Sequence, residues 1–187
     1  SNVSFQNLTF DLNGSKNLTP VYSAIVSTYA TGNNKTHMAI RINNGANVTI
    51  DSITAKNCSG HNMIGIIGNG TFATIKNSNF INGGYYVGST TLKNVNTPDF
   101  SFVYVEWDSF TFNNNIIKQE NLDLGLQSYC GGVEIHGSNC KIYNNTIIGC
   151  FPAMYSSSQL QDKTKPNYAH YTATVSYTHL RAHETLR

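Results

Sequence analysis

Charged residues are scarce in this chain of 187 residues, because Asp, Glu, Lys and Arg together make up only 12% of it, about half the usual quarter. Exposed helices depend on Glu, Lys, Arg and Ala, so this shortage argues against a helical bundle. The net charge of +2 at pH 7 argues against a protein whose main partner is nucleic acid, because such binding needs a clearly basic surface. The sequence contains no run of about 18 apolar residues, so it predicts no membrane-spanning helix.

Uncharged polar residues take the place of the missing charge. Asn alone accounts for about 25 residues, and Thr, Ser and Gly are also frequent. Eleven Tyr and nine Phe argue against disorder, because aromatic residues supply apolar surface that a folded core can bury. The composition therefore predicts an all-β protein that is rich in Asn and Thr.

One pattern recurs along the chain: an apolar residue, a polar residue two positions later, and a second apolar residue five positions after the first. The first apolar column holds Phe5, Ile50, Ile75, Leu92, Phe112 and Ile142. The polar column holds Asn7, Ser52, Asn77, Asn94, Asn114 and Asn144. The second apolar column holds Phe10, Ala55, Phe80, Ile117 and Ile147, and Thr97 is its one polar member. Alternation predicts strands with one buried face. Asn at a fixed offset predicts a bend, because Asn tolerates left-handed backbone. Strands stacked about 4.8 Å apart would let equivalent Asn side chains form a hydrogen-bonded ladder.

The repeating units differ in length. From Ile50 onward, successive members of the first column are 25, 17, 20 and 30 residues apart, and 45 residues separate Phe5 from Ile50. This spacing predicts loops of variable length, and either a long insertion or an unrecognised unit after Phe5. A second strand precedes the column in the segments MAIRI from Met38, NMIGIIG from Asn62, FVYVEW from Phe102 and GGVEIHG from Gly131, and residues 153–156 begin another.

This order of strand, turn, strand, Asn bend and strand resembles the right-handed parallel β-helix of the pectin lyase-like superfamily, over about residues 1–158. The resemblance implies an all-β solenoid of about five to seven coils with an Asn ladder. It also implies a polysaccharide partner and a location outside the cell, on the cell surface or on a virion. Bacteriophage tailspikes share this fold, and membership of that group would imply a homotrimer. An all-β sandwich with Asn-rich turns is the alternative fold.

In the superfamily, substrates lie along the outer face of the first parallel sheet, so outward side chains there are the candidate site. Alternation turns Tyr104 and Glu106 outward in FVYVEW, and Glu134 and His136 outward in GGVEIHG. Aligning the two segments places Tyr104 beside Glu134 and Glu106 beside His136. Glu106 and His136 are therefore a candidate acid–base pair, and the carboxyl groups of Glu106 and Glu134 are candidates for the separation that glycosidases use.

Further candidates lie near this face. Asp108 follows the strand and is a possible third acid, and Arg41 falls in the same columns and is a candidate for binding substrate. Tyr104, Tyr85 and Tyr86 are candidates for packing on sugar rings, whereas alternation predicts that Trp107 lies in the core. The alternative is a solvated polar face with an incidental ion pair, and tyrosines that pack within loops.

The superfamily's catalytic motifs do not transfer to this sequence. The segments of the polygalacturonase-like hydrolases do not occur in order, and Arg41 and Asp51 are only lone candidates for the base and calcium ligand of the pectate lyases. The sequence therefore predicts no metal site and no cofactor, with calcium as the one ion that the resemblance allows.

The four cysteines show no metal-binding spacing, and the prediction for them is small buried side chains. They are Cys58, Cys130, Cys140 and Cys150. Cys140 is expected to face the core. Cys58 and Cys150 share a register but are expected to lie four coils apart, near 19 Å, which is too far for a disulfide.

The two ends of the sequence suggest a fragment. The chain starts inside an alternating segment, and residues 175–187, VSYTHLRAHETLR, differ sharply in composition from what precedes them. This last segment resembles a spurious tail found in chains translated from assembled metagenomic reads. We therefore assign residues 1–174 to the β-helix domain and residues 175–187 to an artefactual tail.

Two functions remain open from the sequence. The first is a carbohydrate-active enzyme, a hydrolase or lyase of an extracellular polysaccharide, and the second is a non-catalytic adhesin, phage fibre or structural segment. A cluster of Glu106, Glu134 and His136 beside exposed aromatic residues favours the first. The expected partner is a polysaccharide, with neither nucleic acid nor membrane as a partner.

Overall fold

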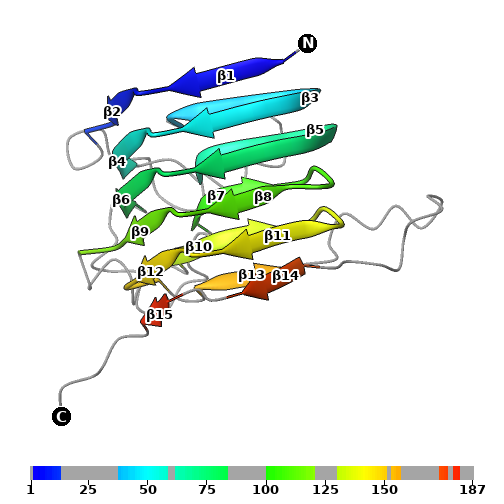
Figure 1. Ribbon diagram of the computed structural model, residues 1–187. Coiled ribbons are helices and arrows are strands. Elements are labelled where there is room, and N and C mark those ends of the chain that lie inside the picture. The colour runs from blue at the N-terminus through cyan, green and yellow to red at the C-terminus, as the bar shows by residue number, and fades with distance from the viewer. Residues whose placement is uncertain are drawn as a thin grey trace, which may run out of the picture.

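The computed structural model describes residues 2–13, 38–58, 62–83, 100–120, 130–150, 153–156, 173–176 and 179–181. In these ranges the chain is all-β, with strands as its regular elements and no helix (Figure 1). It follows that the described residues contain no helix that could cross a membrane. All strand pairs among them are parallel, which does not fit the antiparallel sandwich considered as an alternative.

The strands form two sheets. The nine-stranded sheet contains β1 (Val3–Gln6), β3 (Ile40–Asp51), β5 (Asn62–Lys76), β7 (Phe100–Val105), β8 (Thr111–Asn113), β10 (Cys130–Ile135), β11 (Cys140–Tyr143), β13 (Met154–Ser156) and β14 (Ala173–Ser176). The six-stranded sheet contains β2 (Thr9–Asp11), β4 (Thr54–Cys58), β6 (Asn79–Gly83), β9 (Ile116–Lys118), β12 (Thr146–Ile148) and β15 (His179–Arg181). The long strand β5 pairs with β7 through its first half and with β8 through its second half. Figure 1 shows the strands stacked in rows from β1 to β14.

The two apolar columns predicted from the repeat form the core. In the first, Phe5, Ile50, Ile75, Phe112, Ile142 and Val175 are successive Cα partners. In the second, the successive partners are Phe10, Ala55, Phe80, Ile117, Ile147 and Leu180. From Ile50 to Ile142 and from Ala55 to Ile147, every member is at most 1% exposed. Both columns are therefore confirmed over these members.

One detail of the predicted repeat is wrong, and one alternative that the sequence left open is decided. Ile75 pairs directly with Phe112, so no strand containing Leu92 lies between them; Leu92, Asn94 and Thr97 themselves lie outside the described residues. Phe5 pairs directly with Ile50, so no further row of the stack lies between them, which decides for a long insertion over an unrecognised unit.

This correction also changes the spacing of two cysteines. Cys58 and Cys150 are both buried. Cys58 ends β4 and Cys150 follows β12 by two residues, and the sheet order places these strands three positions apart. Three strand spacings are about 14 Å, which is still too far for a disulfide. Cys140 is 1% exposed, as predicted, whereas the side chain of Cys130 lies outside the described part.

The predicted polar column forms a bend in each row. Asn7, Ser52, Asn77, Asn114 and Asn144 all have φ between 53° and 56°. This left-handed conformation is unfavourable for most side chains, and Asn is among the few that adopt it readily. The abundance of Asn is thus partly explained by the bend.

The buried ladder belongs to the next residue along the chain, not to the bend residue. Ser78, Asn115 and Asn145 are each 1% exposed. Asn145 Oδ1 accepts a hydrogen bond from the Asn115 backbone N–H at 2.9 Å, and Asn115 Oδ1 accepts one from the Ser78 backbone N–H at 3.0 Å. The Asn115 and Asn145 amides also donate to the carbonyl groups of Ile75 and Phe112. The ladder therefore pairs backbone groups that would be costly to bury alone.

A tryptophan fills the turn between β7 and β8. Trp107 is fully buried, as predicted, and its Nε1 donates a hydrogen bond to the Ile67 carbonyl at 3.0 Å. Its ring lies directly on Gly70, where an added Cβ would be 2.2 Å from a ring atom. Only glycine leaves room for the indole at this position.

Strands β14 and β15 lie at or beyond the predicted boundary between residues 174 and 175. In register, β14 pairs with β11 through Val175 and Ile142, and β15 pairs with β12 through Leu180 and Ile147. Residues 175, 176 and 179–181 thus occupy the next position in both sheets.

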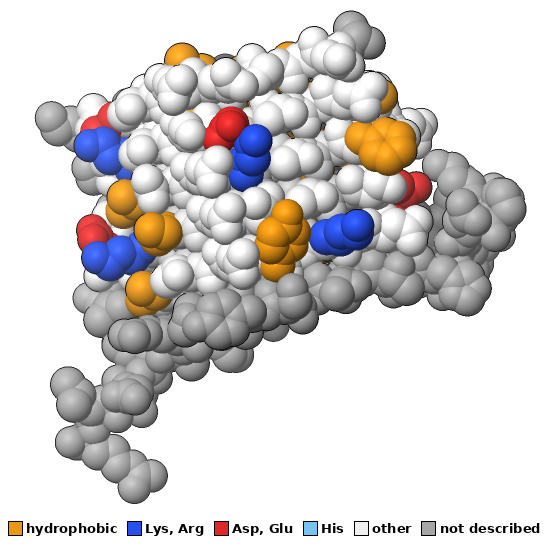
Figure 2. Space-filling model, viewed as in Figure 1, with side chains coloured by type: hydrophobic (Ala, Val, Ile, Leu, Met, Phe, Trp, Pro, Cys, Tyr) orange, Lys and Arg blue, Asp and Glu red, His pale blue; other side chains and the backbone are white. Residues whose placement is uncertain are grey.

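Charged side chains on the face shown in Figure 2 are few, and three Lys–carboxylate ion pairs lie among the described residues. In one of these pairs, the Asp51 carboxylate accepts a hydrogen bond from the Asn77 amide at 2.9 Å and lies 3.3 Å from the Lys76 ammonium. The bond from Asn77, followed by those from Ser52 and Lys76, lowers the pKa of Asp51 below its ordinary value of 3.8. This residue therefore links stability to pH.

We expect Asp51 to contribute stability that is lost in acid. Because its folded pKa is lowered, the contribution is fully present above the unfolded value of 3.8 and disappears as the pH falls through the folded value. Asp51→Asn should therefore lose less stability than the wild type between about pH 5 and pH 2. Urea unfolding at both pH values measures the two losses, and equal losses would contradict the expectation.

Candidate functional site

The candidate site lies on the outer face of the neighbouring strands β5, β7 and β10. The predicted alignment of the last two is confirmed, since Val103 pairs with Val133 and Tyr104 with Glu134. Gly65 of β5 is the partner of Tyr104 on the other side. Tyr104 is thus the middle residue of a line of Cα partners, Gly65, Tyr104 and Glu134, that runs across three strands.

Glu134 of β10 and His136, which directly follows β10, form a buried pair. His136 Nε2 lies 2.7 Å from Glu134 Oε1, and the Ser101 hydroxyl donates to Glu134 Oε2 at 2.6 Å. Glu134 is 2% exposed and His136 4% exposed. Both side chains, which were predicted to face outward, are therefore covered rather than open to solvent. Alternation gives the side of the strand on which a residue lies, but not what covers that side.

Tyr104 and Glu106 of the β7 segment are only half-buried. The Tyr104 hydroxyl donates to Glu106 Oε1 at 3.0 Å, and the Gly68 backbone N–H donates to Glu106 Oε2. Both carboxylate oxygens are thus held by a donor. A fixed, partly accessible carboxylate is suited to accept a proton, and its acid form is suited to deliver one.

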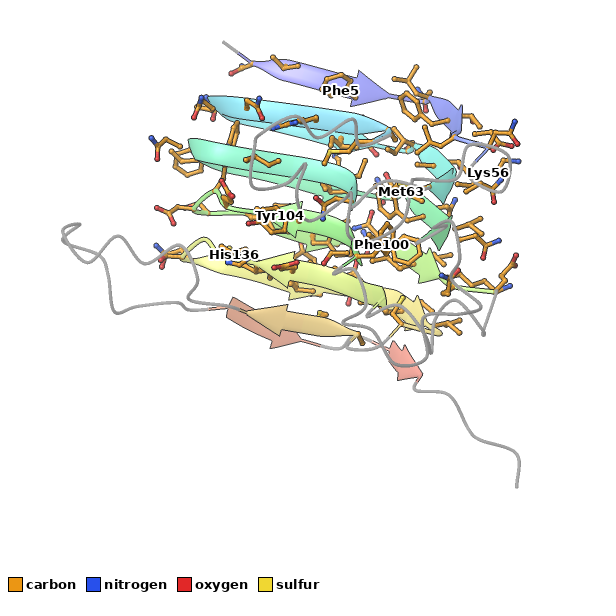
Figure 3. All side chains as sticks on the ribbon, turned by 180° about the vertical axis from the view of Figure 1, so that it is seen from behind. Phe5, Lys56, Met63, Phe100, Tyr104 and His136 are labelled. Atoms are coloured by element: carbon orange, nitrogen blue, oxygen red, sulfur yellow. The ribbon has the colours of Figure 1, made fainter. Side chains whose placement is uncertain are left out.

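Tyr104 also connects the two pairs. Its ring centroid lies 4.9 Å from that of His136, with the planes tilted by 43°, and Figure 3 shows the two side chains on adjacent strands. We call Ser101, Tyr104, Glu106, Glu134 and His136 the outer-face polar group. His136 is bonded to Glu134 rather than to Glu106, so the structure replaces the predicted Glu106–His136 pair with a chain that passes through Tyr104.

One ring nitrogen of His136 makes no hydrogen bond among the described residues. Nε2 faces the Glu134 carboxyl, whereas Nδ1 is buried and has no hydrogen-bond partner in the described part of the chain. If Nε2 donates to a Glu134 carboxylate, the neutral ring carries a lone pair on Nδ1. A carboxylate that orients a histidine in this way can prepare it to accept a proton.

Two predicted site residues are not part of the outer-face polar group. Asp108 is exposed, and its Oδ1 accepts a hydrogen bond from the Ser138 backbone N–H at 2.7 Å, so it stabilises the neighbouring turn. Arg41 is exposed and donates to Asn43 Oδ1 at 3.2 Å. Arg41 lies in the same line of Cα partners as Tyr104, but it is two strands away, with Gly65 between them. Tyr85 and Tyr86 lie outside the described residues.

The sequence did not point to Ser101 or Gly68. Their roles depend on contacts across 33 and 38 residues of sequence, which no local pattern reports. Gly68 did carry a sequence signal, because a glycine that ends the apolar segment NMIGIIG indicates a turn, and its φ of 78° in the structure agrees with this.

Two further observations concern metal ligands and cysteine reactivity in the described residues. They contain no group of three or more His, Cys, Asp and Glu placed to hold a metal ion, and Asp51, a calcium candidate, is paired with Lys76. Burial raises the pKa of the Cys140 thiol to about 11, which keeps it protonated and a poor nucleophile near neutral pH.

Comparison with known proteins gives no match: no family model, no curated protein and no solved structure is significantly similar to this chain.

Proposed function

We propose that this chain is a right-handed parallel β-helix of six coils that binds and cleaves a polysaccharide outside the cell, on a cell surface or on a virion. The coil number follows the six-membered core columns, in which each member pairs in parallel with the next. The right hand follows from the general rule that crossovers between parallel strands of one sheet are right-handed in about 98% of cases. An experimental structure of the chain tests both statements.

The outer-face polar group is the observation that carries the functional proposal. In a chain with 12% charged residues, two carboxyl groups and a histidine are joined by hydrogen bonds and a ring contact across β7 and β10. Glycosidic-bond cleavage requires such proton donors and acceptors beside the sugar. In this scheme Glu106 is the group nearest the substrate, because it is half-buried while Glu134 and His136 are buried.

Glu134 and His136 then have a positioning role. His136 packs on the Tyr104 ring, and the Tyr104 hydroxyl donates a hydrogen bond to Glu106. The buried pair of Glu134 and His136 therefore holds Tyr104, and through it Glu106, in position. The Ser101 hydroxyl completes the support by bonding the second oxygen of Glu134.

A non-catalytic β-helix is the second candidate, and the burial of Glu134 and His136 favours it. A buried, hydrogen-bonded Glu–His pair can serve stability alone. The two candidates differ in what the loss of a carboxylate does, since a structural pair affects unfolding and a catalytic acid affects turnover.

The test is an activity screen on neutral and acidic polysaccharides, with release of reducing ends reporting a hydrolase and unsaturated products reporting a lyase. Glu106→Gln should lower the rate by about 100-fold or more, because general acid–base catalysis contributes about 10²–10⁴-fold. The matched control is Glu120→Gln, because Glu120 is exposed and bonds Lys118 on the other sheet. It should keep full activity.

Two outcomes contradict the enzyme proposal. One is a wild-type protein that releases no product from any polysaccharide of the panel. The other is a set of variants in which Glu106→Gln and Glu134→Gln change the midpoint of urea unfolding but not the rate.

A further inference from the structure

Phe72 lies in a backbone conformation that aromatic residues rarely adopt. Its φ is 62°, in the left-handed region where a bulky side chain is an outlier. Its side chain is 59% exposed, more than any other large hydrophobic residue in the described ranges. The residue therefore carries backbone strain without the benefit of burial.

The stack has small polar residues at the equivalent positions. Asn47, Ser109 and Asn139 lie in the same register as Phe72, because Ala46 pairs with Thr71, Thr71 with Asp108, and Thr111 with Lys141. All three have positive φ, between 56° and 58°. Together with Phe72 they form a second bend column, in which Phe72 is the only aromatic residue among these four described members. The strain is fixed in place, since the Phe72 N–H donates to the Asp108 carbonyl at 3.0 Å.

Strain that persists without a packing benefit points to a function. Building on the proposed function, we infer that Phe72 is a binding platform for the apolar C–H face of a sugar ring. An exposed aromatic ring flanked in its column by the amide of Asn47 and the hydroxyl of Ser109 offers both kinds of contact that a sugar needs, an apolar plane and hydrogen-bonding groups.

The position of Phe72 also bears on the size of the ligand. Phe72 lies four residues along β5 from Gly68, whose N–H holds Glu106. Four residues of strand span at most about 13 Å, so a short oligosaccharide is long enough to contact both the Phe72 ring and Glu106.

The test combines stability and binding in the same variant. Phe72→Asn installs the residue found at positions 47 and 139, so relief of strain should raise the Tm by about 2–4 °C. Loss of the ring should weaken retention in native gels containing polygalacturonate or a neutral β-glucan by about fivefold. Phe72→Trp should keep retention. Ile116→Asn is the matched control, because Ile116 is also exposed, at 44%, but lies on β9 and lacks a positive φ.

The outcomes separate this inference from the proposed function. If Phe72→Asn lowers the Tm, or if it raises the Tm and leaves retention unchanged, the platform is wrong and the proposed function stands. If Ile116→Asn weakens retention as much as Phe72→Asn does, the effect is not specific to the ring and the platform is also wrong. If neither polysaccharide retains the wild-type protein, both proposals are contradicted.

Discussion

Trp107→Ala should lower the free energy of unfolding by about 3–5 kcal/mol, the range found when a large buried aromatic side chain is removed. The indole is fully buried, and its Nε1 bonds the Ile67 carbonyl, which would lose its partner. Urea unfolding followed by far-UV circular dichroism measures the change, because Trp107 is the chain's only tryptophan and its fluorescence disappears with the substitution.

Gly70 supplies the control for this prediction. In the wild type, Gly70→Ala forces a Cβ to within 2.2 Å of the Trp107 ring and should destabilise the fold by about 1–3 kcal/mol. In the Trp107→Ala background the same change should cost less, so the double-mutant cycle should show a coupling energy. Additive costs would mean that the two residues do not form one packing unit.

Asn145→Ala should lower the free energy of unfolding by about 3 kcal/mol, since each buried polar group left without a partner costs about 1–3 kcal/mol. The substitution removes the acceptor of the Asn115 N–H and the donor to the Phe112 carbonyl. Chemical unfolding gives the value. Asn145→Asp keeps an acceptor but loses the amide donor, so it should also be destabilising.

The neighbouring residue provides a matched control, because Asn144 is exposed and occupies the bend with φ 54°. Asn144→Gly should change stability by less than about 1 kcal/mol, since glycine adopts this conformation freely. If Asn144→Gly costs as much as Asn145→Ala, the ladder has been assigned to the wrong residue.

Most of the core was predictable because it depends on a local pattern repeated in register. Alternation placed Ile50, Phe112 and Ile142 correctly, since a period of two fixes the buried side of a strand. The same pattern misassigned Leu92, because alternation cannot show whether a matching segment joins the stack. The ladder was displaced by one residue for a related reason, as Asn at either position of an Asn pair fits a bend.

The candidate site was predictable only in its alignment. Counting residues placed Tyr104 beside Glu134, and the register confirms it. The burial of Glu134 and its bond to Ser101 depend on the three-dimensional surroundings of the strand. The exposed Phe72 went unnoticed, because its unusual feature is a backbone angle rather than a residue pattern.

The ladder has a consequence for how the chain opens to solvent. The backbone N–H groups of Ile53, Ser78 and Asn115 are each bonded to a side chain that belongs to the next row of the stack. These amides can exchange their hydrogens only after the neighbouring row has moved. Native-state hydrogen exchange at Ser78 therefore reports on the row that contains Asn115, and local opening spreads along the stack from row to row.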